Sequence, residues 1–361
     1  MTTPRLFTPL TVRSTTFRNR IWVAPMCQYS VLEKDGVPRD WHLVHLGAMA
    51  SGGAGLVIAE ATAVSPEGRI SDQDTGLWND TQRNAWARVV NFLHSQGAAA
   101  GIQLAHAGRK ASVWPAWGTL ESGTQPPETG GWSTVSASDI AFGDYAAPVA
   151  LDDRGIDAVV NDFVAAASRA IEAGFDVLEI HAAHGYLMHQ FLSPLSNQRT
   201  DEYGGSLENR ARLLLRVITE VRAVVGDEIP VFVRFSATDY AEGGWDQEQT
   251  AIVAGWARAA GADLFDISTG GNISGVRIPL GPGYQVPFAE FVRETADVTV
   301  SAVGLITTPA QAEAVLADGS ADAVMLGREL MRDPHFALRA AHELGHELDY
   351  WPEQYLRARW S

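Results

Sequence analysis

The run Val231-Phe232-Val233-Arg234-Phe235 is short, apolar and rich in β-forming residues, and it follows a segment with helical periodicity. Residues 207–225 carry apolar side chains at three- and four-residue spacing, which predicts a helix. Gly226 follows directly, as a glycine commonly does at the end of a helix. A helix that leads into a short buried strand is part of a parallel βαβ arrangement, so this stretch indicates the α/β class.

The same unit recurs outward in both directions. We predict further helices at residues 79–96, 152–173, 246–260 and 309–317, and glycines follow them at Gly97, Gly174, Gly261 and Gly319. Apolar runs predict eight strands, at residues 21–25, 55–61, 99–104, 175–180, 231–235, 264–268, 298–303 and 323–326. An open, doubly wound sheet would normally have a glycine-rich turn after its first strand, but this chain has Pro25, Met26 and Cys27 there. We therefore predict a closed (β/α)8 TIM barrel, with residues 1–361 as a single domain.

Two stretches fall outside the alternation. Residues 111–148 form a long insertion after the third strand, rich in Gly, Pro and Trp, and we expect it to lie over the catalytic face. Residues 1–20 precede the first strand, and we expect an N-terminal turn or hairpin that plugs the floor of the barrel.

Composition limits the partners and the compartment. The formal net charge is −16 and no basic tract occurs, so we expect neither nucleic acid nor an anionic membrane surface as a partner. Cys27 is the only cysteine, which excludes a disulfide framework, a four-cysteine zinc site and a cysteine-ligated iron–sulfur cluster. Because the chain also lacks a secretory signal and any apolar run of about 20 residues, we predict a cytoplasmic protein.

A phosphate site is predicted after the last two strands. Gly304 and Gly327 follow these strands, where glycine lets backbone amides approach an anion, and Arg328 could clamp it. A single glycine there would be an ordinary turn residue, but two matched glycines beside an arginine favour phosphate. The pattern implies a phosphorylated cofactor or substrate.

The end of the fourth strand carries a cluster of hydrogen-bond donors. His181, His184 and Tyr186 could polarise a carbonyl oxygen and deliver a proton. The competing interpretation is a metal site, because the His-x-x-His spacing can ligate zinc, with a third ligand from another strand such as His106.

Arg234 and Cys27 each allow two interpretations. A guanidinium inside an apolar strand needs an anion or several acceptors, so Arg234 either faces a bound anion or forms a structural ion pair, with Glu179 or Glu60 as candidate partners. Cys27 alone is compatible with a small buried hydrophobe.

Taken in order, these residues resemble the Old Yellow Enzyme flavoproteins, specifically the bacterial thermophilic-like ene-reductases that have a cysteine beside the flavin. The resemblance runs nearly end to end. Its motifs are residues 19–20 leading into 25–29, 60–64, 101–110, 181–186, 197–206, 209–210 and 327–328.

The resemblance implies a tightly but non-covalently bound FMN and assigns residues to it. Ala24, Pro25, Met26 and Cys27 would line one edge of the isoalloxazine, with the thiol able to tune its potential. The other matched positions are Ala61 and Gln103 at the ring, Arg234 at the negative charge of the reduced flavin, and Gly304, Gly327 and Arg328 at the phosphate.

The resemblance also implies a reaction. His181 and His184 would grip the carbonyl or nitro oxygen of an activated alkene, Tyr186 would protonate the α-carbon, and Tyr29 and Lys110 would complete the pocket. NADPH or NADH would give hydride to flavin N5 and leave, and the alkene would then accept it in the same place.

The carboxy-terminal segment resembles a tail that reaches into a neighbouring subunit's site. Arg357 is the expected finger and Arg359 the alternative, which implies a homodimer or homotetramer; a frayed terminus is the competing interpretation. Two other functions stay open on this barrel, a metal-dependent hydrolase and a non-catalytic flavin-binding redox sensor that uses Cys27. Relatives that act on dienoyl-CoA or amines carry an additional iron–sulfur domain for which this chain has neither the length nor the cysteines.

Overall fold

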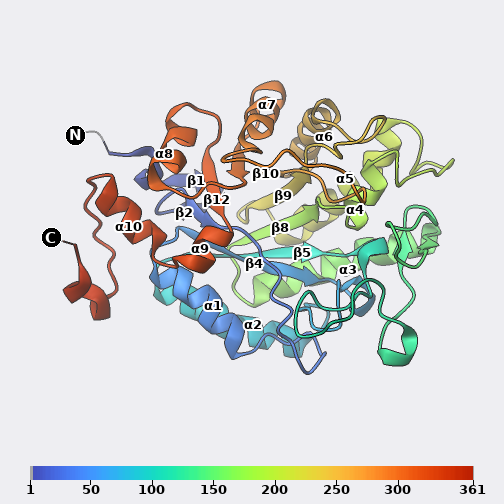
Figure 1. Cartoon of the computed structure of the whole chain (residues 1–361), viewed down its shortest axis with the longest axis horizontal. Helices are drawn as coiled ribbons and strands as arrows, with labels where there is room; N and C mark the ends of the chain where they lie inside the picture. Colours follow the sequence, from blue (N-terminus) through green and yellow to red (C-terminus); the bar gives the residue numbers. More distant parts are fainter. Residues whose placement is uncertain (1–2, 361) are drawn as a thin grey trace.

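A computed structural model describes residues 3–360 of the chain. Within these residues, eight parallel strands close into a barrel in their order along the chain (Figure 1). They are β3 (Ile21–Val23), β4 (Leu56–Ala63), β5 (Ala99–Ala105), β8 (Val177–Ala182), β9 (Val231–Ser236), β10 (Leu264–Ser268), β11 (Val300–Val303) and β12 (Ala323–Leu326). Each predicted strand is present, and β12 pairs with β3 to complete the predicted TIM barrel.

Helices follow the strands and surround the barrel. They are α1 (Asp40–Ser51), α2 (Asp80–Ser95), α3 (Asp153–Glu172), α4 (Leu187–Leu192), α5 (Leu207–Val225), α6 (Gln247–Ala260), α7 (Val286–Ala296), α8 (Pro309–Ala317), α9 (Arg328–Arg332) and α10 (Phe336–Glu343). Short 3-10 turns are η1 (Arg5–Phe7), η2 (Pro66–Gly68), η3 (Gly108–Lys110), η4 (Pro127–Thr129) and η5 (Glu353–Ala358). The five predicted helices are confirmed as α2, α3, α5, α6 and α8, whereas α1, α4, α7, α9 and α10 were not predicted.

Side-chain caps explain where the predicted helices start. The side chain at the N-cap accepts a hydrogen bond from the backbone three residues on, which satisfies one of the free N–H groups of the first turn. The capping residues are Asn79, Asp152, Ser206, Asp246 and Thr308.

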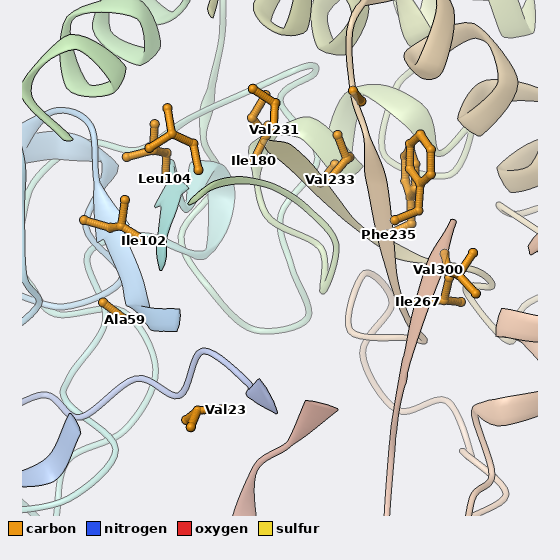
Figure 2. Close-up of a cluster of buried hydrophobic side chains, with 14 of the residues drawn as sticks. Val23, Ala59, Ile102, Leu104, Ile180, Val231, Val233, Phe235, Ile267 and Val300 are labelled. Carbon is orange, nitrogen blue, oxygen red and sulfur yellow. The ribbon is translucent and has the colours of Figure 1, made fainter. Parts of the chain in front are cut away.

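Two apolar layers hold the barrel. The outer layer lies between strands and helices, and Figure 2 shows part of it, including Val23, Ile102, Ile180, Val233 and Ile267. Because side chains alternate along a strand, the neighbouring residues point into the barrel.

The predicted floor plug is a hairpin formed by β1 (Leu10–Val12) and β2 (Thr15–Phe17). Its Phe17 packs on Trp22 inside the barrel with ring centroids 4.8 Å apart, and Trp22 packs on Phe232 at 5.8 Å. All three side chains are buried, so the lower end of the barrel is filled with aromatic rings and the upper end is left for chemistry.

The predicted insertion, residues 111–148, lies between β5 and α3. It contains η4 and the short strand β6 (Val135–Ser136), which pairs in parallel with β7 (Val149–Ala150). No helix within residues 3–360 is long and apolar enough to cross a membrane.

Candidate active site

A polar layer lies directly above the aromatic floor of the barrel. Along β8, β9 and β10 the inward positions change from apolar at the strand starts to Glu179, Arg234 and Asp266 one step higher. Gln103 on β5 donates a 2.7 Å hydrogen bond from Nε2 to Glu179 Oε1. Arg234 Nε lies 2.8 Å from Asp266 Oδ2. These four buried groups form the bottom of the candidate site.

Arg234 forms its ion pair with neither of the two predicted partners, Glu179 and Glu60. Glu60 instead lies 3.1 Å from His42 and accepts a 2.7 Å hydrogen bond from the Gln28 amide. Glu179 is engaged by Gln103. The sequence-based choice of partner was therefore wrong, because the register that places Arg234 opposite Asp266 cannot be read from either strand alone.

The electrostatics of this layer favour one retained proton. Burial and the neighbouring Asp266 raise the pKa of Glu179, against the opposing effect of Arg234. Burial also raises the pKa of Asp266. Glu179 and Asp266 are thus two buried carboxyl groups near one guanidinium. Because an unpaired buried charge is costly, one of the two is expected to keep its proton.

One step higher on the strands, His181, His184 and Tyr186 come together as predicted. The rings of His181 and His184 are 5.2 Å apart, and those of His181 and Tyr186 are 5.0 Å apart. His181 Nδ1 accepts the Ala183 amide proton at 3.3 Å, so its own proton lies on Nε2.

The charge states of these groups follow from their burial. Burial, and then Arg234, lower the pKa of both His181 and His184 well below the usual value, so both imidazoles are neutral. Burial, and then Cys27, raise the pKa of Tyr186 well above the usual value, so the phenol keeps its proton. The cluster therefore consists of neutral hydrogen-bond donors.

Sequence reasoning missed the residues that position His184. Its Nε2 lies 2.7 Å from Ser268 Oγ, and its backbone amide donates to Ser236 Oγ at 2.9 Å. Ser268 also lies 3.2 Å from Oε1 of Gln285, whose own amide group donates to Val303 O at 3.0 Å. Ser268 is the last residue of a predicted strand, and the active sites of TIM barrels lie at the carboxyl ends of the strands, so its position alone indicates a site residue.

Lys110 connects the cluster to the loop after β10. Its Nζ donates to the carbonyl oxygens of His184 and Gly271, both at 2.8 Å. Burial, and then Arg109, lower the pKa of Lys110 to about 8.

Two glycines let these two loops touch. A Cβ added to Gly185 would lie 2.4 Å from Gly271 O, and a Cβ added to Gly271 would lie 2.7 Å from the Cα of His184. Both glycines have positive φ, 74° and 92° respectively. Only residues without a side chain fit this contact.

The turn after β3 contacts the end of the neighbouring strand β12. Ala24 and Ala61 are buried, and the Ala24 amide donates to Leu326 O at 3.0 Å. Met26 follows Pro25 and reaches the end of the adjacent strand β12, because a Cβ added to Gly327 would lie 3.4 Å from its Sδ.

Cys27 and Tyr29 continue this turn. Burial, and then the carboxylates of Asp74 and Glu60, raise the pKa of the Cys27 thiol well above its usual value. Tyr29 has a φ of 48° and packs with Tyr186 in one small cluster. The thiol is thus protonated at neutral pH, and Cys27 is not an activated nucleophile.

The predicted phosphate residues line one cavity that reaches the barrel interior. Gly304, Gly327 and Arg328 line it together with Arg234 and Ser268. Gly304 has a φ of 118°, and a Cβ there would lie 2.7 Å from Gln285 Nε2. The residues predicted to bind phosphate and the guanidinium of the polar layer therefore line the same cavity.

Neither Arg357 nor the possible third metal ligand, His106, completes the site at the end of β8 within this chain. Arg357 belongs to the exposed turn η5, and Figure 1 draws this tail beside α10, on the opposite side of the molecule from the insertion. Among residues 3–360, no group of three or more His, Cys, Asp or Glu side chains is arranged to hold a metal ion. His106 Nδ1 instead accepts the Gly108 amide proton at 3.0 Å.

A TIM barrel with an internal guanidinium, neutral side chains at its mouth and a cavity lined by glycines and arginines has the features expected of a flavin-dependent oxidoreductase. Residues 5–347 match the profile of the NADH:flavin oxidoreductase / NADH oxidase family, and the chain belongs to this family, that of Old Yellow Enzyme. The chain is thus an NAD(P)H:FMN oxidoreductase, with FMN as cofactor and NAD(P)H as reductant.

Full-length relatives carry the same activity in their names. The chain is 49% identical over 355 residues to the NADPH dehydrogenase of Listeria innocua, covering 98% of this chain and 99% of that one. It is 48% identical over 354 residues to the NADPH dehydrogenase of Bacillus subtilis, covering 98% of each.

Solved structures agree with this assignment. Morphinone reductase superposes with a TM-score of 0.79 at 32% identity, over 96% of this chain and 91% of that one. 2-Naphthoyl-CoA reductase has a TM-score of 0.85 at 26% identity, but this chain spans only 52% of its length.

Proposed function

We propose that this enzyme is an ene-reductase that reduces the C=C bond of α,β-unsaturated carbonyl or nitro compounds. The observation that supports this most directly is the cluster at the end of β8, where the His181 ring lies 5.2 Å from that of His184 and 5.0 Å from that of Tyr186. An imidazole pair that stays neutral can donate two hydrogen bonds to one oxygen without protonating it.

The cavity and the polar layer fit FMN. Within the described residues the terminal nitrogens of Arg234 make no hydrogen bond, and Arg234 lines the cavity, so the guanidinium can face an anionic flavin ring. Gln103 donates one amide hydrogen to Glu179. Its amide oxygen and second amide hydrogen would bind the pyrimidine edge of the flavin. Residues 24–27 and Ala61 would line the ring, and Gly304, Gly327 and Arg328 would hold the phosphate.

The side chains above this site would perform the substrate chemistry. When bound, FMN supplies a hydride acceptor and donor, reduced by NADPH or NADH and then oxidised by the alkene in a ping-pong cycle. Nε2–H of His181 and Nδ1–H of His184, whose Nε2 accepts a proton from the Ser268 hydroxyl, hold the substrate oxygen, which withdraws electrons from the double bond. Tyr186 donates its proton to the α-carbon. Tyr29 and Lys110 form part of the pocket wall.

Three wider assignments belong to the same proposal. The chain acts as one FMN-binding domain that is a homodimer or homotetramer. In the assembly Arg357 of one subunit completes the site of a neighbour, which fits its exposed position away from its own site. A cytoplasmic location fits the single cysteine and the supply of reduced nicotinamide.

An anaerobic titration tests the proposal in one cuvette. The purified protein should show flavin absorbance bands that bleach with NADPH and return on addition of 2-cyclohexen-1-one. Bands that bleach but return only with oxygen would refute alkene reduction and favour a flavin redox sensor.

A further inference from the structure

The turn that carries His184 and Tyr186 has an unusual backbone conformation. His184 has a φ of 58° and Gly185 a φ of 74°, so two successive residues lie in the left-handed region. A residue with a side chain rarely adopts this conformation, which persists only where the surrounding structure fixes it. The contacts made to this turn therefore help to set the positions of the His184 and Tyr186 side chains.

Helix α4, which follows the turn, directs two side chains back onto Gly185. His189 Nδ1 accepts the Gly185 amide proton at 3.0 Å, and Gln190 Nε2 donates to Gly185 O at 2.7 Å. Both side chains are fully buried. Gly185, which lies between His184 and Tyr186 in the chain, is thus bonded at both its backbone N–H and its C=O.

A buried carboxylate determines which nitrogen of His189 carries the hydrogen. His189 Nε2 lies 3.1 Å from Asp239 Oδ1, and neither side chain has any exposed area. An ionised carboxylate only accepts hydrogen bonds, so the hydrogen lies on Nε2 and Nδ1 is the acceptor that the Gly185 amide requires. Asp239 Oδ2 also accepts hydrogen bonds from the Ser193 hydroxyl at 2.6 Å and the Trp245 amide at 3.0 Å. Burial alone would raise the pKa of Asp239, but His189 and these donors lower it to about 2, so the carboxylate is ionised at neutral pH.

Among the described residues that line the two cavities of the site, neither His189 nor Asp239 occurs. We propose that these two residues position the reacting end of the enzyme. Acting through the Gly185 amide, they hold His184 and Tyr186 where substrate binding and proton transfer need them. Both are positioning residues that do not touch the substrate. The inference rests on the proposed alkene reduction and adds to it two residues outside the pocket.

Two substitutions of His189 separate the roles of its two nitrogens. In His189→Asn the amide oxygen takes the place of Nδ1 and can still accept the Gly185 amide proton. In His189→Gln the amide group reaches Asp239 from the place of Nε2, but no acceptor remains for Gly185. Both variants remove a buried ring, so both should lower the stability measured by urea unfolding. Only His189→Gln should disturb the turn.

The readouts are the oxidative half-reaction on 2-cyclohexen-1-one and the Kd for 4-hydroxybenzaldehyde, both measured on the FMN-loaded protein. His189→Gln should slow the reaction and raise the Kd by about tenfold each, the scale of one buried amide left without a partner. His189→Asn should stay within about threefold of the wild type in both.

Asp239→Asn tests the position of the ring hydrogen. An amide can donate to Nε2 as well as accept from it, so the hydrogen of His189 can move to Nδ1, where it opposes the Gly185 amide. This variant should resemble His189→Gln in both readouts, although His189 itself is unchanged.

His94→Gln is the matched control, because His94 Nε2 lies 2.7 Å from Asp176 Oδ2 in a second pair of this kind, on the outer helix α2. It should leave both readouts unchanged. Wild-type rate and affinity in folded His189→Gln or Asp239→Asn, or equal losses in His189→Asn and His189→Gln, would overturn the positioning role. A wild type that is reduced by NADPH but not reoxidised by 2-cyclohexen-1-one would instead refute the proposed function.

Discussion

Arg234 on β9 and Asp266 on β10 are paired residues on adjacent parallel strands, and their side chains meet at 2.8 Å inside the barrel. Asp266 is fully buried and also accepts a 3.1 Å hydrogen bond from Ser301 on β11. The pair engages the guanidinium at its Nε, and Arg234 also lines the cavity. Asp266 thereby both orients the cation and reduces its net charge.

Replacing Asp266 by Asn should raise the midpoint potential of the bound flavin. The amide keeps a hydrogen-bond acceptor for Arg234 but removes the compensating charge, so negative charge on the reduced flavin becomes more favourable. A shift of about 30 mV for the two-electron couple would correspond to roughly 1.4 kcal/mol. Equilibration with reference dyes measures the potential. An unchanged or lower potential would mean that Asp266 carries no charge in the wild type.

Replacing Tyr186 by Phe should slow the oxidative half-reaction on 2-cyclohexen-1-one by about 10²- to 10⁴-fold, the usual contribution of general acid catalysis. Flavin reduction by NADPH should change little, because that step needs no proton from Tyr186. Anaerobic stopped-flow measurements separate the two steps. Equal losses in both would remove Tyr186 as the proton donor.

Replacing His181 or His184 by Ala should weaken the binding of phenols, detected through their charge-transfer band with the flavin. Each variant loses one hydrogen bond to a phenolate oxygen, which predicts a rise in Kd of roughly 10- to 100-fold. His94→Gln serves as the control, since His94 lies on the outer helix α2 and pairs with Asp176. Unchanged phenol affinity in His181→Ala and His184→Ala would contradict the proposed grip on the substrate oxygen.

His106 should make the free energy of unfolding depend on pH below neutrality. Burial lowers its pKa from 6.5 to about 4, so between these values the unfolded chain binds a proton that the folded chain does not. The contribution of His106 to stability is therefore present above pH 6.5 and is lost as the pH falls toward 4.

His106→Asn isolates this effect, because its amide oxygen can still accept the Gly108 amide proton. Urea unfolding of wild type and variant is compared at pH 7.5 and 5.5. The wild type should lose roughly 1 kcal/mol more than the variant over this interval. Parallel pH dependences would show that the pKa of His106 is the same in the folded and unfolded chain.

The strands were predictable because each is short, apolar and bounded by a helix and a turn. Helix α1 was missed for a physical reason: Trp41 and Val44 are 52% and 63% exposed, whereas His42 is buried against Glu60. In α1, apolar side chains thus face solvent and a polar side chain faces the core, whereas a helix is recognised from its sequence by the reverse arrangement.

The candidate site was predictable where its residues follow a strand directly. His181, His184 and Tyr186 meet at the end of β8, and Gly304, Gly327 and Arg328 meet at one cavity. Cross-strand relationships were not predictable, because they depend on register and shear. The pairing of Arg234 with Asp266 and the position of Gln285, at the start of α7, are of this kind.

The contact between Gly185 and Gly271 constrains how this enzyme can evolve. Neither position tolerates a side chain unless both loops move. A single substitution at either glycine is therefore expected to disturb the contact. The insertion carries no such restriction at its outer positions, where Leu120 faces solvent. Substitutions that change substrate preference are therefore expected in the insertion. Gly185 and Gly271, which hold the reacting end together, are expected to stay unchanged.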